Sequence, residues 1–277
     1  MQTRTRHARP IGHLVALLWL GLAACGPAAT PPAPAPPVSL PAVDGDSISV
    51  FRPSTNTFYL RHWNTAPAVE VIQPLGAPGD LPVVGDWDGD GKKTIGVYRP
   101  SESTFYLADS NTTNVPALIV PLGGLGDRPL AGDWNGDGTD TVGVYRPSES
   151  TFYLSNFLGP GAADVTVPFG APGDTPIVGD WDGDGTTTVG LFRNAFEVFL
   201  LNSHTSGDPD VLFTYGGMPG DLPVVGDWDG DGDESIGFYR TDTFYLRNEN
   251  STGDPQLIIP YGQSGDLPLA GLFEGLP

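Results

Sequence analysis

The sequence predicts an all-β fold, a five-bladed β-propeller with four-stranded blades of about 47 residues. The first observation is the density of chain breakers, 38 glycines and 29 prolines in 277 residues, which few helices tolerate. The second is that short β-rich segments between turn signals dominate, and no amphipathic helical pattern appears after residue 25. The third is the motif Asp-Trp-Asp-Gly-Asp-Gly, which recurs every 47 residues from Asp86, Asp133, Asp180 and Asp227, with Asn135 replacing one aspartate. A fixed period of this length indicates repeated supersecondary units.

Residues 1–24 are predicted to be a lipoprotein signal peptide. Arg4, Arg6 and Arg9 precede an apolar run that is shorter than a membrane span and ends in Leu-Ala-Ala-Cys at Cys25. This ending resembles the bacterial lipobox, which implies cleavage before Cys25 and acylation of its thiol. The alternative is an ordinary signal peptide followed by a chance cysteine. Because Cys25 is the only cysteine, a disulfide within the chain is excluded.

Residues 25–42 are predicted to tether the head, residues 43–277, to a membrane by the lipid anchor alone. The tether is rich in proline and alanine, so it is extended and semi-rigid. At about 3.1 Å per residue it reaches roughly 50 Å. The formal net charge of the chain is −20, which disfavours nucleic acid and anionic lipid as partners. We expect a monomeric head outside the cytoplasm, at the cell surface or in the periplasm.

One repeat unit contains four short strand-like segments. In the second copy of the motif these are residues 128–132, 141–146, 151–154 and 165–170, with the acidic loop 133–138 between the first two. Four antiparallel strands form a propeller blade, and radial repetition of blades hides most sheet edges. A stacked β-solenoid is the alternative, although it would use shorter repeats.

The ends of the repetitive region fix the number of blades. The region opens on a second-strand segment, residues 48–52, and closes on a first-strand segment, residues 266–271. Five complete blades form only if these two segments pair in a mixed closing blade. The acidic loop of that blade would fall where the chain begins and ends, which accounts for four loops in five blades.

The acidic loops are the predicted metal sites. Carboxylates on alternate residues repel one another unless a cation lies between them, and Ca²⁺ prefers six to eight oxygen ligands. Loop positions 1, 3 and 5 offer side-chain oxygens, and position 7 offers its backbone carbonyl. The predicted ligands of about four structural Ca²⁺ ions are Asp86, Asp88, Asp90 and Lys92; Asp133, Asn135, Asp137 and Thr139; Asp180, Asp182, Asp184 and Thr186; and Asp227, Asp229, Asp231 and Asp233.

The loops resemble the FG-GAP/VCBS calcium-loop repeat of integrin-type and bacterial surface propellers. The resemblance covers roughly residues 43–277 and includes hydrophobic-Gly pairs before the loops, such as Leu122-Gly123. It implies that the ions are structural and that ligands bind on the opposite face. The family usually has aspartate at loop position 9, where this chain has Thr94, Thr141, Thr188 and Ser235. A hydroxyl is a weaker ligand, or acts through water, so we expect modest calcium affinity.

Two other residue types recur with the unit. Tryptophan at loop position 2 either stacks on sugars or, as large repeated aromatics usually do, packs between blades. Arginine ends each second strand and either anchors an anionic ligand or pairs with the aspartate of a recurring Gly-Asp step. The residues concerned are Trp87, Trp134, Trp181 and Trp228, and Arg52, Arg99, Arg146, Arg193 and Arg240.

The predicted function is a binding or adhesion module that recognises a protein or surface ligand. About ten residues between the third and fourth strands differ in every unit while the rest of the repeat barely changes, and variable loops on a rigid scaffold commonly carry recognition. The fourth unit also departs from the pattern at residues 194–199. The alternatives are a multivalent lectin and, less favoured, a glycosidase-type enzyme; we expect no catalytic residues, because glutamates do not recur as an acid–base pair.

Overall fold

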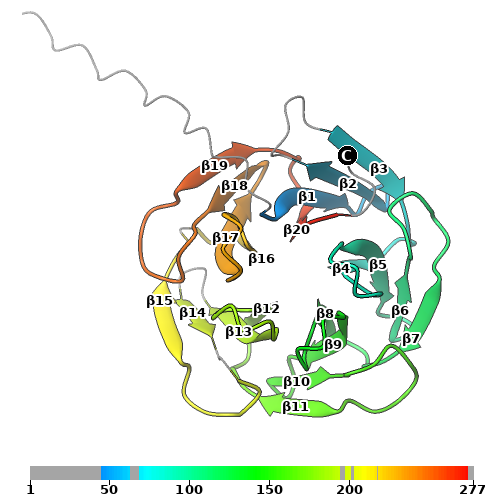
Figure 1. Cartoon of the computed structure of the whole chain (residues 1–277), viewed down its shortest axis with the longest axis horizontal. Coiled ribbons are helices and arrows are strands. Elements are labelled where there is room, and N and C mark those ends of the chain that lie inside the picture. The colour runs from blue at the N-terminus through cyan, green and yellow to red at the C-terminus, as the bar shows by residue number, and fades with distance from the viewer. Residues whose placement is uncertain (1–44, 63–68, 194–196, 201–202, 217, 274–277) are drawn as a thin grey trace, which may run out of the picture. The chain divides into compact units, whose positions relative to one another are not determined.

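The five-bladed propeller predicted above is confirmed. In the computed structural model the described residues are 45–62, 69–193, 197–200, 203–216 and 218–273. They form 20 strands in five four-stranded antiparallel sheets, which stand radially around one axis (Figure 1). Within these residues, no helix is long and apolar enough to cross a membrane. The predicted signal peptide, Cys25 and the tether lie outside the described residues.

We number the blades 1 to 5 around the ring. Blade 1 contains β20 (Leu267–Gly271), β1 (Ser47–Arg52), β2 (Thr57–His62) and β3 (Val69–Pro74). Blade 2 contains β4 (Leu81–Gly85), β5 (Thr94–Arg99), β6 (Thr104–Leu107) and β7 (Leu118–Pro121). Blade 3 contains β8 (Arg128–Gly132), β9 (Thr141–Arg146), β10 (Thr151–Leu154) and β11 (Val165–Pro168). Blade 4 contains β12 (Thr175–Gly179), β13 (Thr188–Arg193), β14 (Glu197–Leu200) and β15 (Val211–Thr214). Blade 5 contains β16 (Leu222–Gly226), β17 (Ser235–Arg240), β18 (Thr243–Leu246) and β19 (Leu257–Pro260).

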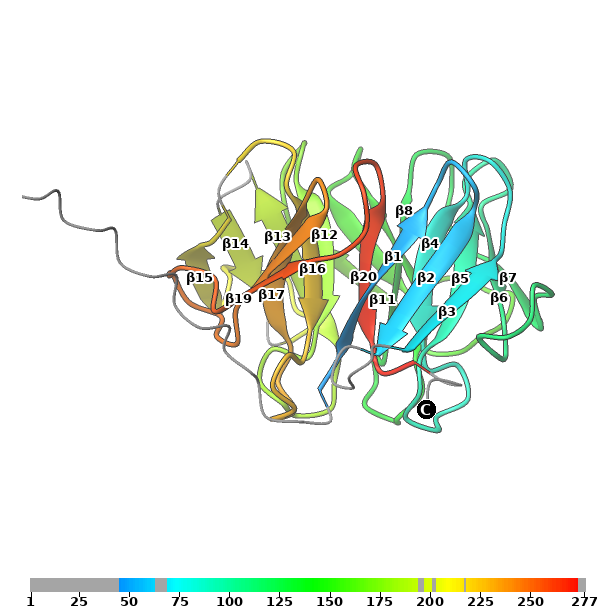
Figure 2. The ribbon, with the colours of Figure 1, turned by 90° about the horizontal axis from the view of Figure 1, so that it is seen from above.

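The two ends of the described chain close the ring. β20 pairs antiparallel with β1, with Ile48 opposite Ala270 and Val50 opposite Pro268. Blade 1 is therefore the mixed blade that the sequence predicted, with its innermost strand from the C-terminal end and its outer three from the N-terminal end (Figures 1 and 2).

The apolar core lies between neighbouring blades. Around blade 2, for example, Trp87 and Val83 pack with Val142 and Val144 of blade 3. The second strand of a blade is buried on both faces, which is why β5 reads Thr-Ile-Gly-Val-Tyr rather than as alternating polar and apolar residues. Burying each large apolar side chain contributes about 1.5–3 kcal/mol, and the contribution is repeated at every blade boundary.

The five innermost strands, β4, β8, β12, β16 and β20, surround the axis. They line an axial cavity of about 220 Å³ with prolines and short aliphatic side chains, and Lys93, Asp140, Thr187 and Glu234 also line it. These four residues all stand two positions after an acidic loop. The axial cavity is therefore apolar along the inner strands and polar where the chain leaves the acidic loops.

Candidate metal centres

Each acidic loop is a tight turn organised by its first aspartate. In blade 2, Asp86 Oδ1 accepts hydrogen bonds from the backbone N–H groups of Gly89 (2.8 Å) and Asp90 (3.1 Å), and Asp86 Oδ2 accepts one from Gly91 (2.7 Å). Gly89 and Gly91 adopt φ values of +75° and +82°, which glycine reaches without strain. A carboxylate has about four lone-pair sites, so Asp86 keeps acceptor capacity after these three bonds.

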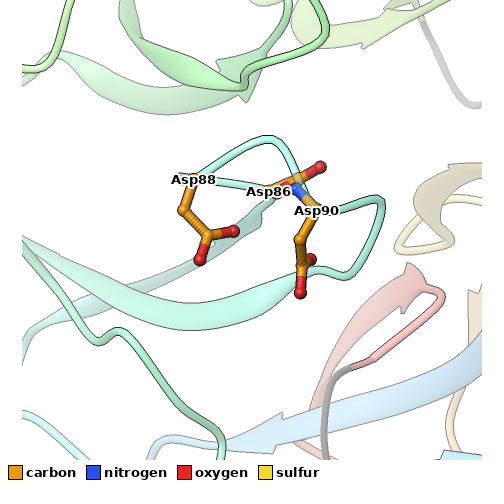
Figure 3. A group of neighbouring side chains, drawn as sticks. All are labelled: Asp86, Asp88 and Asp90. Atoms are coloured by element: carbon orange, nitrogen blue, oxygen red, sulfur yellow. Dashed lines mark hydrogen bonds between the residues drawn. The ribbon is translucent and has the colours of Figure 1, made fainter.

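Three of the four loops bring three carboxylates together. In each, one oxygen from every aspartate lies within 4.8 Å of the others, and the three side chains project from a single turn (Figure 3). These triads are Asp86, Asp88 and Asp90; Asp180, Asp182 and Asp184; and Asp227, Asp229 and Asp231. The loop of blade 3 differs because Asn135 Nδ2 donates to Asp137 Oδ2 at 3.0 Å.

The electrostatics of the loops fit a cation. Two unit charges 4 Å apart repel by about 1 kcal/mol in water and about 4 kcal/mol near a protein surface. Partial burial and repulsion from Asp184 and Asp180 raise the pKa of Asp182, and burial with repulsion from Asp231 and Asp227 raises the pKa of Asp229 in the same way. The hard oxygen donors and their mutual repulsion are what a divalent cation such as Ca²⁺ would satisfy. The aspartate triads can therefore hold metal ions.

Loop positions 7 and 9 have different roles. The position 7 residues close the turn, as when the Lys92 N–H donates to Asp90 Oδ1 at 2.8 Å. The position 9 hydroxyls are buried and donate to backbone carbonyls of their own blades: Thr94 Oγ1 to Ala108 O at 2.9 Å and Thr141 Oγ1 to Ser155 O at 2.6 Å. The position 9 hydroxyls therefore tie neighbouring strands together, and their role as weak ligands stays a prediction.

The residues at loop position 8 join neighbouring blades. The backbone N–H of Asp86 donates to Asp140 Oδ2 (2.8 Å), and the N–H of Asp140 returns a bond to Asp86 O (2.7 Å). Equivalent pairs link Asp133 to Thr187, Asp180 to Glu234 and Asp227 to Asp46. At the remaining boundary the Lys93 N–H donates to Leu272 O at 2.7 Å. These five residues form a ring of contacts between blades. Sequence reasoning missed it because the five positions hold four different residue types and share only their 47-residue spacing.

At one position of this ring the side chain is a lysine, Lys93, which cannot accept a hydrogen bond as the other four side chains do. Lys93 Nζ instead lies 3.5 Å from Glu234 Oε1 in the axial cavity. Burial lowers the pKa of Lys93, but Glu234, Asp46 and Asp140 together outweigh it and hold the pKa above its usual value. Burial raises the pKa of Asp46 to about 6 despite the nearby Lys93. The carboxylates beside the axis are thus engaged with backbone amides and one lysine.

The four loop tryptophans are packing residues. They are only 1–7 % exposed, and a Cβ added at Gly85 would lie 2.5 Å from the Trp87 ring. Their indole N–H groups find no acceptor among the described residues, so the rings contribute apolar contact. Rings buried in this way are not available to stack on a sugar.

The five arginines form the predicted pairs with buried aspartates. Arg146 donates from Nε to Asp127 Oδ1 (3.0 Å) and from Nη2 to Asp127 Oδ2 (2.9 Å), and its guanidinium lies 4.6 Å from the centre of the Tyr153 ring. The other pairs are Arg52–Asp266, Arg99–Asp80, Arg193–Asp174 and Arg240–Asp221. The interpretation that these arginines are structural is confirmed.

The variable loops share a face with the acidic loops. Within blade 2, Gly85 pairs with Thr94 and Gly96 pairs with Leu107, so the β4–β5 and β6–β7 connections leave the sheet at the same end. Direct contacts agree: in blade 5, Asn248 Nδ2 donates to Asp229 Oδ2 at 2.9 Å. His204 Nε2 lies 3.0 Å from Trp134 O of the neighbouring blade, and burial lowers the pKa of this histidine. Residues 194–196 of the irregular fourth unit lie outside the described residues.

The chain was compared with family models, curated proteins and solved structures. No family model matches the chain, and no curated protein matches it. One similar solved structure is an Agrocybe aegerita lectin described as recognising non-reducing terminal N-acetylglucosamine, with 13% identity and a TM-score of 0.40 over 79% of this chain and 78% of that one. Another is the Tc holotoxin pore of Photorhabdus luminescens, with 15% identity and a TM-score of 0.34 over 79% of this chain and 11% of that one. At these TM-scores we infer nothing about function from either structure.

Proposed function

We propose that the protein is a calcium-stabilised, lipid-anchored binding or adhesion module that acts outside the cytoplasm and recognises a protein or surface ligand. The observation that carries this proposal is the placement of the variable loops. They differ in all five units and stand on a scaffold of nearly identical blades, at the same ends of the strands as the acidic loops. Rigid scaffolds that present variable loops are typical of recognition proteins.

Calcium enters the proposal as a stabiliser of the face that carries the variable loops. The aspartate triads and the resemblance to FG-GAP/VCBS repeats both support it. Each loop is bonded to the next blade through the residue at position 8, so an ion that orders one loop also supports a blade boundary. At ten times its dissociation constant an ion stabilises the fold by about 1.4 kcal/mol per site. The structural arrangement differs in one respect from the family expectation, since the most variable loops share the metal-loop face instead of the opposite one.

We propose no catalytic activity. The carboxylates nearest the axis already accept hydrogen bonds from backbone amides, and Glu234 also contacts Lys93. A lectin is the second candidate, and the observation that favours it is a cavity between two blades, which the next subsection describes.

The test removes calcium and one of its proposed ligands. The full chain is stripped with a chelator, titrated with Ca²⁺ by calorimetry, and then used to capture material from cell surfaces with and without Ca²⁺. We expect binding heat, a rise in the melting temperature and calcium-dependent capture. Asp88→Ala is the informative variant, because Asp88 is exposed and its loss removes a ligand without opening the core. In the presence of chelator its melting temperature should equal that of the unsubstituted chain. When Ca²⁺ is added, its melting temperature should rise by less.

Asp109→Ala is the matched control. Asp109 is an exposed aspartate of a variable loop in the same blade, outside the acidic loop. Its substitution should leave the calcium response unchanged. Absence of both heat and thermal shift would refute the calcium sites, and a chain that captures nothing in either condition would refute the binding function.

A further inference from the structure

A cavity lies between blades 2 and 3, beside the strands and away from the axis. Its volume is about 380 Å³, within the range of small-molecule sites. On one side it is lined by Leu122 and Glu102 of blade 2, and on the other by Val144, Arg146 and Tyr153 of blade 3. Neither the acidic loops nor the axial channel contributes to it.

The residue that follows the outer strand differs between the blade boundaries. At two other boundaries this residue is a tyrosine whose hydroxyl donates to a backbone carbonyl of the next blade: Tyr215 to Tyr245 O (3.2 Å) and Tyr261 to Tyr59 O (3.3 Å). Between blades 2 and 3 the same place holds Leu122, and the carbonyl in register with Tyr245 O belongs to Tyr153. Phe169 holds this place between blades 3 and 4, and Leu75 holds it between blades 1 and 2, where it is only 5 % exposed. Leu122 is shorter than the two tyrosines, and it shapes the cavity together with the residues of the blade 3 loop.

The variable loop of blade 3 supplies the outer wall with small residues. Gly161, Ala162 and Ala163 line the cavity, and Leu158 of the same loop packs against the blade 2 core. A Cβ added at Gly161 would lie 3.2 Å from the Phe157 ring, so the loop is closely folded at this point. The connection between the third and fourth strands, which is the most variable part of the repeat unit, therefore shapes this cavity.

The two charged residues that line the cavity, Glu102 and Arg146, are opposite in sign. Each also has a partner outside the lining: Glu102 lies 3.4 Å from Arg99, and Arg146 is held by Asp127 at 2.9 Å. Arg99 and Arg146 each contact two carboxylates, so the surroundings are acidic and, like the formal charge of −20, disfavour anions. Polar groups nevertheless remain within reach, because the Glu102 side chain is half exposed and Arg146 is partly exposed. Leu122 and Tyr153, which are partly exposed, add apolar surface. The lining thus combines hydrogen-bonding groups with apolar walls and carries no excess charge.

We propose that this cavity binds one uncharged sugar residue of a surface glycan. A pyranose ring has an apolar C–H face, which suits Leu122 and the Tyr153 ring, and hydroxyl groups that both donate and accept. Glu102 would accept from such hydroxyls and Arg146 would donate to them. This inference rests on the proposed binding function and names the ligand class of one site; it needs neither the acidic loops nor the buried tryptophans as sugar contacts.

The test fills the cavity with a side chain that the fold already accepts at equivalent places. Leu122→Tyr copies Tyr215 and Tyr261, so it should fold and donate to Tyr153 O while it occupies the sugar site. The full chain in calcium is screened on an array of uncharged hexoses and N-acetylhexosamines, and the strongest binder is titrated as the free monosaccharide. We expect Leu122→Tyr to weaken binding by about tenfold or more. Ala162→Phe, at an exposed loop position, should weaken it independently.

Leu125→Tyr is the control, because it makes the same change at a side chain that is 91 % exposed and does not line the cavity. Its affinity should stay within about twofold of the unsubstituted chain. Equal binding by Leu122→Tyr, or equal loss in Leu125→Tyr, would overturn the assignment of the cavity. If the unsubstituted chain binds no uncharged sugar but still captures cell-surface protein, the sugar inference fails and the binding function stands. If it captures neither, both fail.

Discussion

At the scale of single residues, the repeat places an arginine and an aspartate so that each satisfies the other. The aspartates are almost fully buried and the arginines only partly, so each pair neutralises a buried carboxylate with a cation that still reaches solvent. The aspartate also accepts a backbone N–H three residues earlier, as when Ala77 donates to Asp80 Oδ2 at 2.8 Å. One residue pair therefore holds both a strand end and the turn that enters the next blade.

Removing one arginine should be costly because it leaves its carboxylate buried. In Arg146→Gln, Asp127 loses both charge-assisted hydrogen bonds, and breaking a buried pair in this way costs about 3–5 kcal/mol. Since Arg146 is itself partly exposed, we expect about 2–3 kcal/mol, measured as the free energy of unfolding in urea at constant Ca²⁺. Arg128→Gln is the control, because Arg128 is exposed and should change stability by less than about 0.5 kcal/mol. Equal effects of the two substitutions would contradict the structural role of the pair.

At the scale of strands and loops, the predictable features are those in which the same residue recurs. The Arg146–Asp127 pair and the acidic loops could be predicted because residue type and spacing repeat together. The ring at loop position 8 could not, because Asp46 and Thr187 accept the same hydrogen bond with different chemical groups. The cavity between blades 2 and 3 could not be predicted either. It is shaped by Leu122, at a place where two other blades carry a tyrosine, and by the residues of a loop that follows no repeat. Neither of these features forms a recurring motif.

The ring at loop position 8 can be tested where it depends on one hydroxyl. Thr187 Oγ1 accepts from the buried Asp133 N–H at 3.1 Å, so Thr187→Val leaves that donor without its side-chain acceptor. We expect a loss of about 1–2 kcal/mol in the free energy of unfolding, together with faster hydrogen exchange at the Asp133 amide. Thr187→Ser keeps the oxygen and should retain most of the protection. Unchanged exchange in Thr187→Val would show that this bond does not hold blades 3 and 4 together.

At the scale of the whole molecule, the propeller is a ring of blades that is closed by the pairing of one strand from each end of the chain. The stability of the ring therefore depends on the blade that these two strands complete. Four blades are each built from a continuous stretch of chain, whereas blade 1 is completed only when β20 pairs with β1. The same joint also carries the Arg52–Asp266 pair and the bond from the Lys93 N–H to Leu272 O. No acidic loop spans β20 and β1 within the described residues, so calcium could not directly reinforce this blade as it could the other four.

Removing residues 266–277 should therefore weaken the entire ring and not only blade 1. The deletion removes β20, leaves β1 with an exposed edge, uncovers apolar groups such as Val50 and Ile48, and deprives Arg52 of its partner. We expect the melting temperature to fall by about 10 °C or more, since each kcal/mol shifts it by about 2–4 °C in a chain of this size. Hydrogen exchange should accelerate first in β1, the sheet partner of β20, and in β16 and β4, which lie on either side of it around the axis. Deletion of residues 274–277 alone leaves β20 in place and should change neither measurement. A ring that melts at the same temperature without β20 would show that closure through blade 1 does not stabilise the fold.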